Sequence, residues 1–219
     1  YVVGSSPYDG VGGGGILNHG SLTLTDCEVR SNRAASLQGG GIYNTGTLAI
    51  FESAITGNSS LCPAGARYCS GSMSGGGIYN TADGALRLVD SVLAGNSSYY
   101  YSAVSGHAEF VNSTVSGNDS PRFGASKLSG GPILSTVSAT GSTFAGNYAG
   151  RSGVMGNATL INCTAYGNRA GHVVGGGLVI NSTLVGETVD PGPTFSPSAF
   201  LVQGGTVVNS VLYLKKLPC

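Results

Sequence analysis

Residues 39–58 read Gly39-Gly-Gly-Ile-Tyr-Asn44, Thr45-Gly46, Thr47-Leu-Ala-Ile-Phe-Glu52, Ser53, Ala54-Ile-Thr-Gly-Asn58. They contain three short apolar segments, and each segment ends in Asn or Glu. Apolar residues that alternate over a few positions between Gly or Asn are typical of strands and not of helices. Asn and Gly also tolerate the left-handed backbone of tight turns. Three strands and three turns in about 20 to 25 residues predict one triangular coil of a parallel β-helix.

The same pattern recurs along the chain. An apolar residue is followed by a spacer, by Asn, Asp or Glu, by a small residue and by a second apolar residue before Gly-Asn. A unit of this size cannot bury its own apolar face, so its copies must stack. We therefore predict an all-β solenoid of about eight triangular coils with little or no α-helix. The copies are Leu24–Asn32, Ile50–Asn58, Leu88–Asn96, Phe110–Asn118, Leu160–Asn168 and Val179–Glu187, with weaker ones at Ala139–Asn147 and Val207–Leu214.

The continuous repeat predicts a single domain spanning 1–219, which fits either a processed exported chain or a piece of a longer one. Within the copies, six residues separate the Asn, Asp or Glu position from the Gly-Asn position, including Asn181 to Glu187. Insertions are expected near 59–74, 97–104, 119–129 and 188–199. The predicted inward residues of the first three coils are Ile16, Leu22, Leu24, Val29, Ile42, Leu48, Ile50, Ile55, Ile78, Leu86, Leu88 and Leu93.

Composition narrows the classes of function. Only 9% of the 219 residues are charged and the net charge is zero, which argues against a nucleic-acid partner. No apolar run approaches the roughly 18 residues of a membrane-spanning helix. Of the five cysteines, Cys62 and Cys69 flank a short loop and predict a local disulfide. Cys27 and Cys163 occupy one repeat position roughly 24 Å apart along the stack, so we expect them to replace buried Ser.

Seven Asn-x-Ser/Thr sequons indicate an extracellular or cell-surface glycoprotein, although the repeat itself also places Asn before Ser and Thr. Asn58, Asn96 and Asn118 lie at the Gly-Asn turns, where a glycan is expected to have room, and Asn157 is a fourth candidate. The other three, Asn112, Asn162 and Asn181, are expected to be inaccessible in a polar column of the turns.

The runs Gly39-Gly-Gly-Ile-Tyr-Asn44 and Gly75-Gly-Gly-Ile-Tyr-Asn80, each followed by the Gly-Asn element, resemble right-handed parallel β-helix repeats of the pectin-lyase-like class. They are similar to the repeats of polymorphic outer-membrane proteins and related surface proteins. This resemblance implies the coil but not one activity, since the same fold serves lyases, hydrolases, adhesins and structural stalks. The paired Asp and the Arg-x-Lys segments of the related polysaccharide-degrading enzymes have no counterpart here.

Acidic residues occupy one column on three consecutive predicted coils. Asp26, Glu52 and Asp90 would lie about 5 Å apart, at a spacing that suits calcium or a carboxyl with a raised pKa. The alternative is a ladder of turn residues, which we favour. That ladder would continue through Asn112, Asn162, Asn181 and Asn209. No other metal site or cofactor is expected, because His19, His107 and His172 are scattered.

Aromatic residues form the other candidate surface. Leu17, Tyr43 and Tyr79 occupy one outward position on successive coils, and Tyr99, Tyr100 and Tyr101 follow in a loop. Such a row is suited to a glycan or to a neighbouring protein. A flat file of Thr-x-Thr would indicate ice binding, but Thr23-Leu-Thr25 is followed by Ala49/Phe51 and Arg87/Val89 at the equivalent positions.

These features favour a non-catalytic extracellular structural or adhesive module that assembles end to end or side by side in a surface layer, filament or appendage. Its expected partners are other copies of itself or adjoining surface proteins, with glycans as a further partner. The alternative is a carbohydrate-active enzyme or a carbohydrate-binding β-helix, and ice binding ranks third.

Overall fold

The computed structural model of the chain describes residues 12–35, 37–62, 73–120, 132–150, 152–188 and 200–215. Within these ranges every helix or strand assigned is a β-strand, which confirms the predicted all-β class. The strands form a 13-stranded sheet, an 8-stranded sheet and a small pair, and their pairing is parallel. None of the described segments provides a helix that is long and apolar enough to cross a membrane.

The strands fall into three rows that the chain visits in turn. The first row contains β1 (Ile16–Asn18), β4 (Ile42–Asn44), β8 (Ile78–Asn80), β12 (Val104–Val111), β14 (Leu134–Thr140), β16 (Gly153–Ile161), β18 (His172–Val174) and β21 (Phe200–Val202). The second row contains β2 (Ser21–Thr25), β5 (Thr47–Phe51), β9 (Ala85–Val89), the later parts of β12, β14 and β16, β19 (Gly177–Ile180) and β22 (Thr206–Val208).

The third row is the 8-stranded sheet. It contains β3 (Glu28–Arg30), β6 (Ala54–Thr56), β10 (Val92–Ala94), β13 (Thr114–Ser116), β15 (Thr143–Ala145), β17 (Thr164–Ala170), β20 (Thr183–Thr188) and β23 (Val211–Lys215). The short strands β7 (Ser59–Ser60) and β11 (Ser97–Ser98) pair beside this row. We call one strand segment from each row a tier, so that β1, β2 and β3 form the first tier and β21, β22 and β23 the last.

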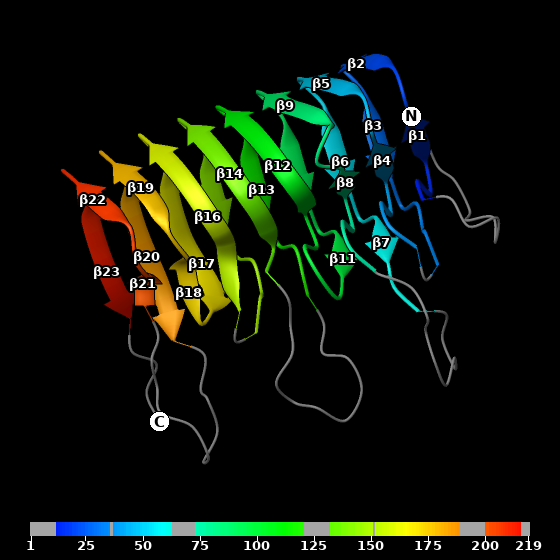
Figure 1. The fold of residues 1–219 in the computed structure, drawn as a ribbon. Helices are drawn as coiled ribbons and strands as arrows, with labels where there is room; N and C mark the ends of the chain where they lie inside the picture. The colour runs from blue at the N-terminus through cyan, green and yellow to red at the C-terminus, as the bar shows by residue number, and fades with distance from the viewer. Residues whose placement is uncertain are drawn as a thin grey trace.

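Successive tiers stack in register, as Figure 1 shows from the blue N-terminal end to the red C-terminal end. Ile42 pairs with Ile16 on one side and with Ile78 on the other. In the second row Ile50 pairs in the same way with Leu24 and Leu88. Like residues therefore lie on like residues, as the sequence repeat predicts.

The apolar core runs through the middle of the stack. Ile42, Leu48, Ile50 and Ile55 of the second tier are each at most 1% exposed, and the predicted inward residues of the third tier are equally part of the core. In the first tier Ile16 and Leu22 are only partly buried. The predicted inward positions are thus confirmed.

The turn between the second and third rows repeats one backbone conformation. Its residue has a left-handed φ between 44° and 54° wherever it is not glycine. Gly141 takes the same place with a φ of 62°. This column, which we call the corner column, consists of Asp26, Glu52, Asp90, Asn112, Gly141, Asn162, Asn181 and Asn209.

One part of the predicted repeat is wrong. Glu187 does not take the place of Asn168 in the next tier, because the pairing of β17 with β20 shifts register. Asn168 pairs with Gly186, and Arg169 pairs with Glu187. The parts of the predicted insertions at 63–72, 121–129 and 189–199 lie outside the described residues.

Candidate functional site

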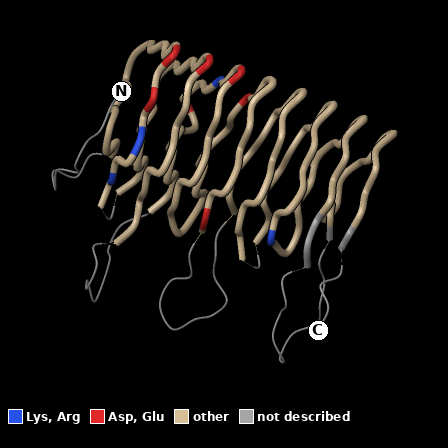
Figure 2. Tube along the Cα trace, turned by 180° about the vertical axis from the view of Figure 1, so that it is seen from behind, with Lys and Arg blue, Asp and Glu red and all other residues tan. Residues whose placement is uncertain are grey.

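The acidic row lies at the corner column, where all three side chains are exposed. Asp26, Glu52 and Asp90 have φ values of 51°, 48° and 49°. Figure 2 shows acidic residues along one edge of successive turns near the N-terminus. Across the described ranges, no group of three or more His, Cys, Asp or Glu side chains is arranged to hold a metal ion. The three residues of the row thus supply turns of the corner between the second and third rows.

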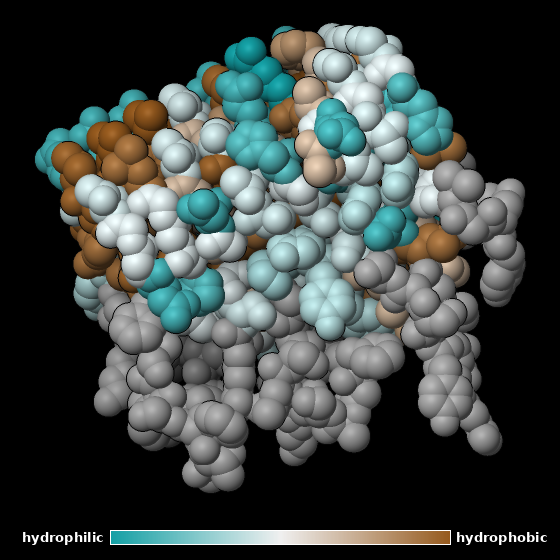
Figure 3. Space-filling model, viewed as in Figure 1, coloured by the Kyte–Doolittle hydropathy of each residue, from teal (hydrophilic) through white to brown (hydrophobic). Residues whose placement is uncertain are grey.

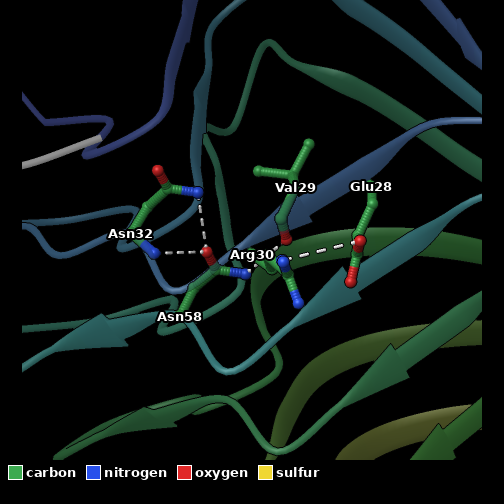
Figure 4. A network of polar contacts seen from close by, with 5 residues as sticks. All are labelled: Glu28, Val29, Arg30, Asn32 and Asn58. Carbon is green, nitrogen blue, oxygen red and sulfur yellow. Dashed lines mark hydrogen bonds and ion pairs between the residues drawn. The ribbon is translucent and has the colours of Figure 1, made fainter. Parts of the chain in front are cut away.

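A different column forms a continuous ladder inside the stack. Figure 4 shows its first step, in which the backbone N–H and Nδ2 of Asn32 donate to Oδ1 of Asn58 at 3.0 and 2.9 Å. Asn58 Nδ2 also donates to the carbonyl of Val29 at 2.9 Å. The same pattern continues through every later step. The members of this asparagine ladder are Asn32, Asn58, Asn96, Asn118, Asn147 and Asn168, each at most 1% exposed.

The prediction that glycans have room at the Gly-Asn turns is therefore wrong. At these turns the glycine takes the left-handed conformation, as Gly57 and Gly95 do with φ of 61° and 62°. The Asn that follows points into the stack, so that Asn58, Asn96 and Asn118 have no exposed surface. The constant spacing of the Gly-Asn pair was the sequence signal for this ladder.

The prediction for the corner column is wrong in the opposite sense. Asn112, Asn162 and Asn181 were expected to be inaccessible, yet all three are exposed, as is Asn209. Each of these residues itself takes the left-handed conformation, so its side chain lies outside the corner. One bond within this column joins Asn209 Nδ2 to Asn181 Oδ1 at 2.7 Å.

A shorter asparagine ladder follows the glycine runs along the chain. Asn18 Nδ2 donates to Asn44 Oδ1 at 2.6 Å, and Asn44 Nδ2 donates to Asn80 Oδ1 at 2.6 Å. The neighbouring runs lie against backbone, since a Cβ on Gly40 would approach Ser59 to 2.4 Å. The glycines therefore permit close packing of chain segments, and no ligand is needed to account for them.

The residue after the corner column forms a ladder of hydroxyl groups. The Ser53 N–H donates to Ser91 Oγ at 3.2 Å, and Ser91 Oγ donates to the Val89 carbonyl at 2.7 Å. Cys27 and Cys163 take the equivalent positions as free thiols, as predicted from their repeat position. Burial raises the pKa of the Cys163 thiol, although hydrogen bonds with the backbone act in the opposite direction.

The predicted disulfide between Cys62 and Cys69 involves one residue that the structure describes and one that it does not. Cys62 is disulfide-bonded, and its Sγ lies 3.5 Å from Met73 Sδ. The predicted partner, Cys69, lies outside the described residues.

The tyrosine row places two rings in contact. Tyr43 and Tyr79 stack with their ring centroids 5.2 Å apart and an interplanar angle of 16°. Both are half-buried, whereas Leu17, their register partner in the first tier, is 44% exposed. The Gly12 backbone lies close to the Tyr43 ring, because a Cβ added to Gly12 would overlap Cδ2 of Tyr43. Stacking in successive tiers follows from the register.

The second group of tyrosines lies next to β11. Tyr99 and Tyr101 are half-buried, and Tyr101 has a left-handed φ of 53°. Tyr100 is 52% exposed and forms a parallel bridge with Ser74. These residues follow β11 beside the third row. They are not in the column of Tyr43 and Tyr79, because the register partner of Tyr79 in the next tier is Ser105.

Two ionisable side chains outside the predicted sites have pKa values shifted by burial. Burial raises the pKa of the Asp119 carboxyl and lowers that of the His172 imidazole. Asp119 forms bridges with Ser97 and Tyr148, and the Arg169 guanidinium lies 5.7 Å from the Tyr148 ring centroid. His172 packs instead on the Gly153 backbone, where an added Cβ would meet its Nε2 at 2.1 Å. His172 belongs to β18 in the first row, whereas Asp119 lies outside the three rows.

The last tier exposes two apolar residues, Val207 and Leu212, whose columns are buried in the tiers before it, together with apolar residues of outward columns. Figure 3 shows hydrophobic residues gathered at the end that carries β22 and β23 in Figure 1. Leu212 pairs with the fully buried Leu184 but is itself 43% exposed. The exposed apolar residues of this end are Val207, Val208, Val211, Leu212 and Tyr213.

A scan against protein-family models, a search of curated proteins and a search of solved structures each found no match to this chain. The pectin-lyase-like class therefore remains a prediction from the quoted motifs. The role of the chain has to be argued from the surfaces described above.

Proposed function

We propose that the chain is a right-handed parallel β-helix of about eight triangular coils, and that it is a non-catalytic extracellular structural module that stacks end to end. The parallel sheets and the aliphatic columns support the coil. Parallel strands joined by a crossover are right-handed in nearly all proteins, which supports the handedness.

The open last tier carries the proposal. Val207 and Leu212 continue the inward columns of Val179 and Leu184, but they are 38% and 43% exposed whereas their partners are fully buried. Apolar residues on an unpaired sheet edge favour the addition of further strands. The same columns would become fully buried if another tier followed.

A second copy of the chain is the occupant that fits this end. Because each row is parallel throughout, the first tier of another copy presents β2 and β3 in the direction that β22 and β23 require. Figure 2 shows charges of both signs near the N-terminus, and in the first tier Glu28 and Arg30 form an ion pair at 3.6 Å. The new pairs would repeat the contacts that already join one tier to the next.

The distribution of ionisable side chains supports a non-catalytic role. The acidic row is exposed on turns, His172 lies in β18 of the first row, and Asp119 forms isolated bridges with Ser97 and Tyr148. An acid–base pair needs two such groups within hydrogen-bond reach of one substrate. The arrangement is better suited to a scaffold than to a reaction centre.

The test compares assembly of the wild-type chain with that of two variants. Leu212→Glu places a charge in the exposed inward column, whereas Val92→Glu makes the same kind of change at a 40% exposed position on the side of the stack. Sedimentation velocity and electron microscopy should show rods that lengthen with concentration for the wild type and for V92E, and monomers for L212E. A wild-type chain that stays monomeric, or an L212E chain that still forms rods, would contradict the proposal.

The Tyr43–Tyr79 stack supports a second candidate, a carbohydrate-binding surface. Two parallel rings 5.2 Å apart offer the kind of aromatic platform on which sugars pack. Tyr79→Ala should then abolish retardation of the protein in gels that contain a bound polysaccharide, and Tyr79→Phe should preserve it. Equal mobility of the wild type and Y79A in every polysaccharide gel would eliminate this candidate.

A further inference from the structure

The seven sequons of the chain divide into two structural sets. Three of them, Asn58, Asn96 and Asn118, belong to the buried asparagine ladder. The other four are exposed: Asn112, Asn157, Asn162 and Asn181. The tripeptides differ as well, because every buried sequon ends in Ser and every exposed sequon ends in Thr.

The buried set is chemically unable to carry a glycan in the folded state. An N-glycan replaces one hydrogen of Nδ2, and the ladder uses both. Asn96 Nδ2 donates to the Ile55 carbonyl at 2.9 Å and to Asn118 Oδ1 at 3.1 Å. Loss of either bond would leave a buried polar atom unpaired. A sugar would also need space that the buried position does not provide.

The exposed set has the opposite geometry. Asn112, Asn162 and Asn181 sit in the corner column with φ of 49°, 54° and 47°, on the outer side of a tight turn. The bond that Asn181 makes in this column accepts through Oδ1 and does not use its Nδ2. Asn157 lies at the other end of the second-row part of β16 from Asn162, so the two residues bracket that segment.

We infer that Asn112, Asn157, Asn162 and Asn181 are N-glycan acceptors, and that glycans cover the two edges of the second row while the buried sequons stay unmodified. The inference rests on the extracellular location in the proposed function. In the transfer step, Nδ2 attacks C1 of a lipid-linked oligosaccharide. The N–C1 bond forms, the bond from C1 to the pyrophosphate oxygen breaks, the lipid pyrophosphate leaves and Nδ2 loses one proton.

The corner column also tolerates the product of enzymatic glycan removal. A peptide N-glycosidase leaves Asp in place of each modified Asn. Asp26 and Asp90 already occupy this column with left-handed φ, so Asp at position 112, 162 or 181 should be accommodated. In the asparagine ladder the same change would place a carboxylate among buried carbonyls, at a large cost in stability.

The experiment secretes the full chain from a eukaryotic host and maps glycan sites by peptide N-glycosidase treatment in heavy-oxygen water followed by mass spectrometry. We expect label at one or more of the four exposed positions, none at the three buried ones, and unchanged thermal unfolding after glycan removal. Label at Asn58, Asn96 or Asn118 in the folded protein, or no label at the four exposed positions, would overturn the inference.

A matched variant separates the effect of the fold from that of the sequon. Thr114→Ser converts Asn112-Ser-Thr into the Asn-Ser-Ser tripeptide found at Asn58 and Asn96. Continued modification of Asn112 in T114S supports the structural explanation, whereas its loss would assign the difference to the third residue. Sedimentation of the same samples reports on assembly separately, so that failure of one proposal is distinguishable from failure of the other.

Discussion

Val179 and Val207 are register partners on β19 and β22, yet Val179 has no exposed surface and Val207 is 38% exposed. The two residues share a type, a row and an inward column. They differ because another tier follows Val179, whereas no tier follows Val207 among the described residues. The pair therefore measures what one tier contributes to the burial of the tier before it.

This pair provides the first prediction. Val179→Ala should lower the free energy of unfolding by about 2 kcal/mol, because it leaves a cavity in a closed core. Val207→Ala should change the free energy of unfolding of the unassembled chain by less than about 0.5 kcal/mol. Urea denaturation followed by circular dichroism, at concentrations where the chain is monomeric, measures both. Equal losses would show that the last tier is already covered.

The second prediction concerns the asparagine ladder. Asn96→Ala removes the acceptor for the Asn58 N–H at 3.0 Å and leaves the Ile55 carbonyl without its donor. We expect a loss of roughly 3 kcal/mol or more, since several buried polar groups lose their partners together. Hydrogen exchange at the Asn58 amide should become faster in this variant.

The control for the ladder is Asn162→Gly in the exposed corner column. Glycine adopts the φ of 54° at this position without strain, so the expected change is within about 1 kcal/mol. A ladder variant as stable as this control would mean that the buried bonds contribute little.

The third prediction uses the conformation of the corner column. Glu52 has a φ of 48°, which is costly for a residue with a Cβ, and Gly141 occupies the same column. Glu52→Gly should raise stability by roughly 0.5 to 1 kcal/mol, after the greater entropy of glycine in the unfolded chain is counted.

The comparison for Glu52→Gly is Glu109→Gly, at an extended position of β12. That change removes a strand side chain and an exposed ion pair with Arg87 at 3.6 Å, so it should lower stability by about 1 kcal/mol. Thermal unfolding of the two variants should therefore shift in opposite directions. Shifts of the same sign would contradict the backbone explanation.

The fourth prediction concerns pH. Burial lowers the pKa of His172, so the unfolded chain binds a proton at this residue more readily than the folded chain does. Stability should therefore be complete above the ordinary histidine pKa of about 6.5 and should fall as the pH drops through that value. His172→Gln should lose less stability than the wild type between neutral and mildly acidic pH, as followed by the unfolding temperature. An equal loss in both proteins would assign the pH effect to other groups.

Sequence reasoning predicts the strand rows and the inward aliphatic residues, because the alternation of apolar residues is a direct consequence of a pleated strand. It also places Cys27 and Cys163 in the serine ladder, since position within the repeat determines position in the stack. Ile42 and Ile50 are clear examples, since the spacing in the sequence alone identifies both their row and their direction.

It fails at the turns, where two columns of Asn look alike. In one turn Asn112 itself adopts the left-handed conformation and lies outside, whereas in the other Gly117 adopts it and Asn118 lies inside. The identity of the left-handed residue decides which way the next side chain points. Composition around the turn does not reveal that choice, which explains the exchange of buried and exposed sequons. Glu187 was misplaced because the spacing in the sequence persists, whereas the pairing shifts register and sets Glu187 opposite Arg169.

The parallel pairing of every row has a consequence for any assembly of this chain. If the pairing across the contact is parallel as it is within the chain, a first tier lies on a last tier, so the contact joins two unlike surfaces. Such a contact does not close on itself as a twofold dimer does. A filament built in this way would have two chemically distinct ends, with the apolar last tier at one of them, and its length would have to be set by something other than the geometry of the contact.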